Sequence, residues 1–177
     1  MHSYDYAHRS GVETITWERF AQLARTLVEK LAPFNIEAVL GTARAGLFPA
    51  TAVCLMLRTE LYPVRVSRRV NDEVLFQHPQ WRVDVSAEVR DKVVAVVDEI
   101  ADTGETLNLV ADRTREKGAR RVITATLVAH SWAKPMPDMV ALTTDALVMF
   151  PWDERVYIAG KWQPHPELVE ALKRQAS

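Results

Sequence analysis

An unbroken apolar run, Val93–Val97, constrains the fold of this chain more than any other segment. Five consecutive small or β-branched residues are typical of a strand that is covered on both faces, as in a parallel sheet. A helical pattern from about residue 105 to 117 follows, ended by Gly118, and a second strand is predicted over 122–129. Strand, helix and strand in this order predict an α/β domain with a mainly parallel sheet.

The rest of the chain continues this alternation. Thr16 is a good N-cap, and apolar residues recur at helical spacing from Trp17 to Leu31. A short strand is predicted over Ile36–Leu40, stopped by Gly41, and the nearly all-apolar segment Gly46–Leu57 is predicted to be a buried helix. Further strands are predicted over 62–67, 81–85, 139–142 and 147–150, and a final helix over 164–174. No repeat or linker divides the chain, so one domain is expected.

Composition narrows the class of protein. The 177 residues, 48% of them apolar and 25% charged, are typical of a globular chain with one substantial core. Lys and Arg number 22 against 23 Asp and Glu, so the net charge of −1 provides no general attraction to nucleic acid or to an anionic membrane. Neither is expected as a partner.

The cellular location is predicted from three features. The longest apolar stretch, Ala45–Leu57, contains Pro49 and is too short to span a membrane. The first 14 residues are polar and lack the apolar region of a signal peptide. The single cysteine, Cys54, cannot form an internal disulfide and lies among apolar residues, where burial is expected. Together these features predict a cytoplasmic protein.

The segment after the central strand, Asp98–Thr106, is where chemistry is expected, because open α/β sheets bind ligands beyond the carboxyl ends of their strands. Asp98, Glu99 and Asp102 place three carboxylates within five residues, and helix capping would explain only one of them. They predict a partner with hydroxyl donors or a nearby cation. The turn Thr103–Thr106 leads directly into a helix, where its N–H groups and hydroxyls suit a phosphate.

Other interpretations fit this segment less well. A capped helix with Asp102 as the N-cap explains the turn but not Asp98 and Glu99. The triplet Asp-Thr-Gly also occurs in aspartic proteases, where it lies between strands and not before a helix. A receiver domain would not need the Thr-Gly-Glu-Thr turn, and the Walker pattern is absent.

The segment Val94–Thr106 resembles the phosphoribosyl pyrophosphate (PRPP) motif of type I phosphoribosyltransferases. That motif has four apolar residues, two acidic, two apolar, and then Asp-Thr-Gly-x-Thr, and every position matches in residue class. Gly41–Ala50 is similar to the pyrophosphate loop of bacterial xanthine-guanine and hypoxanthine phosphoribosyltransferases, and Phe150–Asp153 is similar to their Pro-Trp-Asp segment. The resemblance spans about residues 36–153. It implies one phosphoribosyltransferase domain over 1–177, with a core at about 36–130 and a small hood for the base formed by the N-terminal segment and about 131–160.

The resemblance implies a site for the sugar phosphate at the end of the central strand. Asp98 and Glu99 would accept hydrogen bonds from the ribose 2′ and 3′ hydroxyls, because carboxylates are pure acceptors. The 5′-phosphate would be held by the Thr-Gly-x-Thr turn, which comprises Thr103, Gly104, the backbone of Glu105 and Thr106.

The pyrophosphate would lie against Arg44 and Ala45, in a loop that often contains a non-proline cis peptide, here Ala43–Arg44. Ala45 departs from the family, where many members have Gly, and so adds a methyl group where backbone approaches phosphate. Arg82 would supply a further contact to pyrophosphate. The polar stretch Arg68–Gln80 corresponds to the mobile loop that closes over the family's active site, and an ordinary hairpin is the alternative.

The resemblance also assigns catalysis and base binding. Asp102 would take the N7 proton of a purine as general base while N9 attacks the anomeric carbon. Mg²⁺ would arrive with PRPP, with Glu99 in direct or water-mediated contact. His130 stands where the family has a Lys that donates to the base, Leu147 stands where an aromatic residue stacks on it, and Val148 would offer its backbone. Trp132 and Trp152 could stack instead, although burial in the core is the expected role of both.

The resemblance therefore predicts a PRPP-dependent transfer of ribose 5-phosphate to a nucleobase, most simply a 6-oxopurine, with release of pyrophosphate. The substrates would be PRPP and the base, and a homodimer or homotetramer is expected. Two alternatives stay open at this point. One is a non-catalytic sensor of PRPP or a nucleotide on the same fold, favoured by the departures at His130 and Leu147. The other is a phosphoribosyltransferase for a different ring, such as a pyrimidine.

Overall fold

The computed structural model describes residue 9 and residues 11–67, 69–70, 73–74 and 80–175. The chain divides into two units, a larger one over Leu23–Thr143 and a smaller one in which Met1–Gln22 joins Thr144–Ser177. The boundary falls inside helix α1 (Trp17–Leu31), between Gln22 and Leu23.

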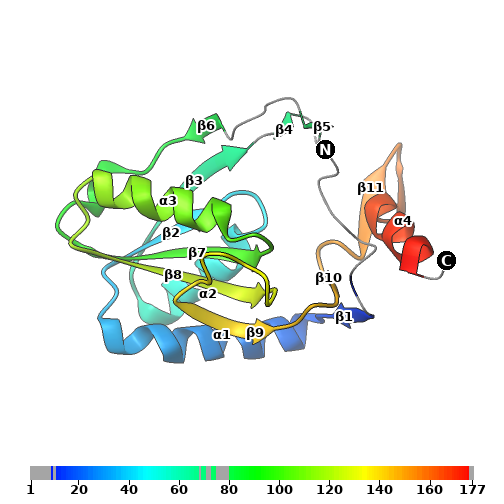
Figure 1. The fold of residues 1–177 in the computed structure, drawn as a ribbon, viewed down its shortest axis with the longest axis horizontal. Coiled ribbons are helices and arrows are strands. Elements are labelled where there is room, and N and C mark those ends of the chain that lie inside the picture. The colour runs from blue at the N-terminus through cyan, green and yellow to red at the C-terminus, as the bar shows by residue number, and fades with distance from the viewer. Residues whose placement is uncertain (1–8, 10, 68, 71–72, 75–79, 176–177) are drawn as a thin grey trace. The chain divides into compact units, whose positions relative to one another are not determined.

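The larger unit contains a six-stranded sheet in the order β6-β3-β2-β7-β8-β9 (Figure 1). Neighbouring strands run parallel except β3 and β6, which are antiparallel. The sequence-based expectation of an α/β domain with a mainly parallel sheet is therefore confirmed. The six strands are β2 (Ala38–Thr42), β3 (Glu60–Ser67), β6 (Gln80–Val83), β7 (Val93–Ala101), β8 (Arg121–Ala129) and β9 (Met139–Thr143).

The helical connections between strands identify the switch point of the sheet. Helix α2 (Leu47–Leu57) joins β2 to β3, and helix α3 (Glu105–Glu116) joins β7 to β8, on opposite sides of the pair β2-β7. Because such crossovers are right-handed, α2 and α3 cover opposite faces of the sheet. The strand order thus reverses between β2 and β7, which is the switch point where open α/β sheets bind ligands. Two short 3-10 helices, η2 (Ala32–Phe34) and η3 (Ala87–Val89), complete the connections described in this unit.

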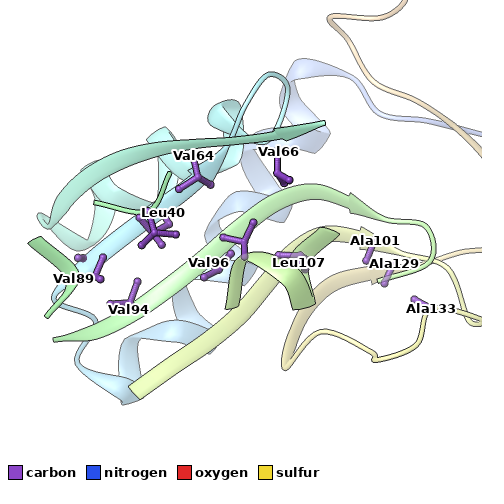
Figure 2. Close-up of a cluster of buried hydrophobic side chains, with 13 residues drawn as sticks. Leu40, Val64, Val66, Val89, Val94, Val96, Ala101, Leu107, Ala129 and Ala133 are labelled. Atoms are coloured by element: carbon purple, nitrogen blue, oxygen red, sulfur yellow. The ribbon is translucent and has the colours of Figure 1, made fainter. Parts of the chain in front are cut away.

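A layer of aliphatic side chains between the sheet and α3 forms one part of the core (Figure 2). Leu40 from β2, Val64 from β3, and Val94 and Val96 from β7 point into it, and Leu107 covers them from α3. All five are less than 4% exposed. Its burial stabilises the sheet from which the loop after β7 leaves, by about 25 cal/mol for each Å² of apolar surface removed from water.

Gly41 corrects one expected boundary. It was expected to stop a strand over Ile36–Leu40, but β2 runs from Ala38 to Thr42 and includes it. A Cβ atom at Gly41 would lie 2.7 Å from the Ala50 Cβ and 2.9 Å from a Leu47 methyl. Gly41 therefore allows α2 to approach the strand closely, which is a packing requirement rather than a turn signal.

Helix α2 also corrects an expectation, because it is not buried all round. Phe48, Leu55 and Met56 are 42%, 71% and 46% exposed, whereas Val53 and Cys54 on the opposite face are buried, as expected for Cys54. Burial raises the pKa of the Cys54 thiol, so it is a poor nucleophile. Thr16 caps α1 as predicted, accepting a hydrogen bond from the Arg19 N–H at 3.2 Å.

The smaller unit contains the strands that flank the chain ends. Strand β1 (Val12–Thr14) pairs in parallel with β10 (Leu147–Met149), and a hairpin of β11 (Arg155–Ile158) and β12 (Lys161–Pro164) leads to helix α4 (Pro166–Gln175). The hairpin was not predicted. An aromatic cluster holds the Pro-Trp-Asp segment in this unit: Trp152 contacts Trp17, Phe20 and Phe150, with ring centroids 4.8–6.0 Å apart.

Most of the polar stretch Arg68–Gln80 lies outside the described residues. Its described parts are β4 (Arg69–Val70) and β5 (Glu73–Val74), which pair antiparallel. The prediction of a mobile closing loop stays a prediction. Within the described part of the chain, no helix has the length and apolar character needed to cross a membrane.

Candidate functional site

Two loops meet at the switch point of the sheet. Strands β2 and β7 pair in parallel, with Gly41 opposite Val97, so the loops that follow them leave the sheet at the same edge. Contact between the loops is close: a Cβ atom at Gly46 would lie 2.5 Å from Asp98 Oδ1 and 3.0 Å from Asp98 Cα. The absence of a side chain at position 46 thus brings the first loop directly onto the first acidic residue of the second.

The acidic pair is electrostatically strained. Asp98 is 7% exposed, and its Oδ1 accepts a hydrogen bond from the Glu99 N–H at 2.9 Å. Burial, followed by the negative charge of Glu99, raises the pKa of Asp98 well above its usual range. A ligand that brings hydroxyl donors or positive charge to this pair would stabilise the ionised form. This is the partner that the sequence predicted for these carboxylates.

The first loop carries one exposed charged residue, Arg44. The Ala43–Arg44 peptide is cis, as expected from the resemblance. Arg44 is exposed and Ala45 half-buried. The N–H groups of Leu47 and Phe48 donate to the carbonyls of Arg44 and Ala45, at 3.2 and 3.0 Å, so the loop winds directly into α2. The Arg44 side chain therefore lies on the surface of the same loop whose Gly46 contacts Asp98.

The second loop forms the turn that was predicted to hold phosphate. Thr103, Glu105 and Thr106 are exposed, while Gly104 is buried with φ +84° and precedes α3. The Glu105 N–H donates to the Thr103 hydroxyl at 3.3 Å. This contact occupies one of the amides assigned to phosphate, so a bound phosphate would take the place of the Thr103 hydroxyl at that amide. The Glu105 side chain is exposed, and the prediction that only its backbone faces a ligand stays a prediction.

A third segment, His130–Pro135, packs against this turn and is called the post-β8 loop below. The Lys134 N–H donates to the Thr103 carbonyl at 2.8 Å, and the His130 N–H donates to the Ala101 carbonyl at 3.1 Å. The Pro135 carbonyl lies so close to Gly104 that a Cβ atom there would collide with it. Gly104 is therefore needed both for its positive φ and for this close approach.

Asp102 lies between these contacts, and two aromatic nitrogens approach its carboxylate. Trp132 Nε1 lies 3.4 Å from Asp102 Oδ1, and His130 Nε2 lies 3.9 Å from the same oxygen. The two rings stack, with centroids 4.5 Å apart and an interplanar angle of 15°. His130 is completely buried, Asp102 is 29% exposed, and Trp132 is 40% exposed rather than part of the core as expected. Sequence reasoning gave Trp132 no contact with Asp102.

Three predicted residues belong to a more distant strand of the sheet or to the smaller unit. Arg82 is exposed on β6, which is separated from β7 by β3 and β2, a span of about 14 Å at about 4.8 Å per strand. Leu147 and Val148 belong to the smaller unit, where both are buried and pair with Val12 and Glu13 of β1. The structure brings together the predicted residues of the two loops and His130: Arg44, Ala45, Asp98, Glu99, Asp102, Thr103, Gly104, Glu105 and Thr106.

The carboxylates at the site suit a cation that is bound partly by the protein and partly by a ligand. Among the described residues, no group of three or more His, Cys, Asp or Glu side chains could hold a metal ion by itself. The pair Asp98 and Glu99 offers two adjacent carboxylates at the edge of the site. Mg²⁺ commonly binds through one or two carboxylates together with substrate phosphates and waters, so these residues fit such an ion.

Comparison with known proteins places this geometry in context. A family model for the phosphoribosyl transferase domain matches residues 14–159. No curated protein matches the chain. Among solved structures, the purine phosphoribosyltransferase of Pyrococcus horikoshii is 27% identical, with a TM-score of 0.73, and the match covers 83% of this chain and 97% of that one.

Two further structures share the fold at lower identity. A hypothetical protein of Neisseria gonorrhoeae with bound ppGpp is 19% identical with a TM-score of 0.71, and the match covers 96% of this chain and 98% of that one. The xanthine-guanine-hypoxanthine phosphoribosyltransferase of Helicobacter pylori is also 19% identical, with a TM-score of 0.65 and coverages of 82% and 93%.

Proposed function

Because this chain belongs to the phosphoribosyl transferase family, whose enzymes join a nucleobase to the ribose 5-phosphate of PRPP, we propose that its base is a 6-oxopurine and that the loops around Asp98 form its active site. The observation that carries the proposal is the junction of three groups at the switch point. These are the strained acidic pair after β7, the helix-capping turn beside it, and the Gly46 loop packed onto Asp98.

Each group suits one part of PRPP. Asp98 and Glu99 receive the ribose 2′ and 3′ hydroxyls, whose donors would stabilise the ionised form of Asp98 that burial and Glu99 disfavour. The turn Thr103–Thr106 receives the 5′-phosphate at the N-terminus of α3, where backbone N–H groups and the helix dipole favour an anion. The exposed Arg44 meets the pyrophosphate, and Arg82 adds a contact from β6.

The reaction requires that the base and PRPP be held in position and that one group accept a proton. The base N9 forms a bond to the anomeric carbon, the bond from that carbon to pyrophosphate breaks, and pyrophosphate leaves with the bonding electrons. The N7 proton passes to Asp102, which is accessible and lies next to the phosphate turn. Holding the two substrates in line removes most of the entropic barrier, and the phosphate-binding groups stabilise the developing charge.

Mg²⁺ belongs to the proposal as an ion carried by PRPP. Glu99, next to the buried Asp98, would hold it directly or through water. When bound, the ion supplies positive charge that neutralises the pyrophosphate leaving group. Burial and the charge of Glu99 disfavour the ionised form of Asp98 in the free protein. The positive charge of the ion would stabilise that form.

The choice of base rests on similarity. The 27% identical Pyrococcus horikoshii protein is a purine phosphoribosyltransferase, and the Pro151–Asp153 segment matches the subgroup that uses 6-oxopurines. Leu147 would pack on the ring and Val148 would present backbone groups to its edge. His130 would reach the base only if its buried ring became accessible. A cytoplasmic location and a homodimer or homotetramer complete the proposal.

One observation favours a second candidate, a nucleotide sensor. The Neisseria gonorrhoeae structure with ppGpp matches 96% of this chain, including part of the C-terminal segment beyond the family match. Like PRPP, ppGpp presents a phosphorylated ribose with pyrophosphate groups, so the same loops could receive either compound. In this candidate function, nucleotide binding is not followed by transfer.

Pyrophosphate release distinguishes the two candidates. The protein is incubated with PRPP, Mg²⁺ and hypoxanthine, guanine, xanthine, adenine or uracil in turn, and calorimetry measures ppGpp binding in parallel. We expect release with one or more of the 6-oxopurines and none without a base. Release only with adenine or uracil would refute the choice of base. If none of the five bases gives pyrophosphate release and ppGpp binds, the result would instead support the sensor.

A further inference from the structure

The post-β8 loop holds the backbone on both sides of Asp102. The His130 N–H bonds to the carbonyl of Ala101, the residue before Asp102, and the Lys134 N–H bonds to the carbonyl of Thr103, the residue after it. Ala133 anchors the loop, because it is 3% exposed and lies with Ala101 in the cluster shown in Figure 2. The main chain at Asp102 is therefore held at both neighbours by one short segment.

The same loop also reaches the Asp102 side chain. Trp132 Nε1 lies 3.4 Å from Asp102 Oδ1, which is a long hydrogen bond that a small movement would tighten. The completely buried His130 ring stacks on the indole at 4.5 Å and so fixes its plane. The Ala133 N–H donates to the His130 carbonyl at 3.1 Å and closes the turn that presents Trp132. An exposed indole is thus held in one orientation against a reactive carboxylate.

We propose that Trp132 is a positioning residue for Asp102, with its indole N–H holding Oδ1 while His130 holds the indole. The inference rests on the proposed function, in which Asp102 takes a proton from the base. A carboxylate can rotate about its terminal bond, and proton transfer requires one oxygen in line with the base N–H. A donor fixed on Oδ1 restricts that rotation, so the other oxygen is presented at a constant angle. Trp132 therefore contributes to transfer but not to PRPP binding.

The kinetic test replaces Trp132 by Phe, which keeps a ring against His130 and removes the N–H. We expect kcat to fall about tenfold, the effect of losing one hydrogen bond to a charged group, with the KM for PRPP within about twofold of the wild type. Trp162→Phe is the matched control, because Trp162 is 62% exposed on β12 and its replacement should leave both constants unchanged. An unchanged kcat in Trp132→Phe, or an equal loss in PRPP binding, would overturn the proposal.

A second readout needs no turnover. The chain has five tryptophans and hence five indole N–H signals in a ¹⁵N correlation spectrum, of which Trp132→Phe identifies one by its loss. In Asp102→Ala that signal should move while the signals of the other four stay in place: Trp17, Trp81, Trp152 and Trp162. An unmoved Trp132 signal would refute the contact. If the wild type transfers to no base, the proposed function fails, and this spectrum still decides whether Trp132 holds Asp102.

Discussion

Gly46 lies against Asp98 so closely that a methyl group at position 46 would stand 2.5 Å from Oδ1 and 3.0 Å from Cα of the aspartate. The backbone at Gly46 has φ −60° and ψ −14°, a conformation open to any residue. Space, and not backbone freedom, therefore explains the glycine. This contact joins the loop assigned to pyrophosphate to the carboxylate assigned to ribose, so the two subsites depend on each other's position.

Gly46→Ala should therefore damage both stability and PRPP binding. Overpacking at such a contact costs about 1–3 kcal/mol of the free energy of unfolding, because either Asp98 or the loop must shift. We expect the calorimetric Kd for PRPP with Mg²⁺ to rise at least about tenfold. Ala45→Gly is the matched control on the same loop, since it removes a methyl group, and it should bind PRPP as tightly as the wild type or more tightly. Wild-type affinity in Gly46→Ala would contradict the packing argument.

Asp98→Asn should separate stability from function. In the folded state Asp98 keeps its proton to higher pH than in the unfolded chain, where the pKa is about 3.9, so its contribution to the free energy of unfolding falls as the pH rises above that value. Asn carries no charge at this buried position. The variant should be more stable than the wild type at pH 7.5 by at least about 1 kcal/mol, or about 2–4 °C in Tm, yet bind PRPP poorly.

The pH dependence provides the check on Asp98→Asn. Because the penalty exists only where the unfolded aspartate is ionised, the stability difference should shrink as the pH is lowered towards about 4. Denaturant unfolding at several pH values measures it directly. A variant less stable than the wild type at neutral pH would show that Asp98 is not strained by burial and Glu99.

Thr106→Ala tests the phosphate turn. Thr106 is exposed at the start of α3, and its replacement by Ala removes one hydroxyl without disturbing the core. We expect PRPP affinity to fall about tenfold or more, since a hydrogen bond to a charged group contributes about 1.5–3 kcal/mol. Thr51→Ala on the exposed face of α2 is the control and should leave the affinity unchanged. Equal affinities in the two variants would remove the turn from the binding site.

Asp84→Asn tests an ion pair outside the site. Asp84, which follows β6, accepts two hydrogen bonds from Arg113 of α3, at 2.9 and 2.8 Å, and lies 2.8 Å from the Lys117 ammonium. The hydrogen bonds to Arg113 and then Lys117 hold the pKa of Asp84 well below its usual range. The pair is 38% exposed on each side, so the loss should stay within about 1 kcal/mol.

The stability effect of Asp84 has the opposite sign to that of Asp98, because ionisation of Asp84 stabilises the folded state whereas ionisation of Asp98 destabilises it. A lowered pKa stabilises the fold fully above the unfolded value of about 3.9, and this stability is lost progressively as the pH falls from that value towards the lower pKa of the folded state. The difference between Asp84→Asn and the wild type should therefore stay constant above about pH 5 and narrow steadily as the pH is lowered below about 4. Asp112→Asn, which breaks an exposed pair with Arg115 within α3, is the control and should cost less. Equal losses would mean that Asp84 does not tie the end of β6 to α3.

The sheet and the two loops were predictable because their signals are local. The run Val93–Val97 has no polar residue to face solvent, and a strand of that kind requires cover on both faces, which β7 has. Asp98 and Thr106 follow within the same few residues, so their position at the strand end comes with the strand. The strand and the site residues could therefore both be predicted from one contiguous segment of the sequence.

Contacts between distant segments left no such pattern. Nothing near Trp132 in the sequence indicates that its indole would meet Asp102, which lies 30 positions earlier, because the post-β8 loop is shaped by backbone hydrogen bonds and not by periodicity. Gly41 was expected to stop the strand, because nothing near it in the sequence indicates that Ala50 on α2 needs the space a side chain would fill. The hairpin β11-β12 was missed although Ala159 and Gly160, both with positive φ, form a turn between its short alternating strands.

The central claim is that the end of β7 binds the sugar phosphate. A crystal structure of the protein with ribose 5-phosphate tests it most directly. The account predicts the phosphate at the amides and hydroxyls of Thr103–Thr106, and the 2′ and 3′ hydroxyls on Asp98 and Glu99, with the Glu105 N–H released from the Thr103 hydroxyl. Ribose 5-phosphate bound elsewhere, or absent at a concentration that inhibits the enzyme, would contradict it.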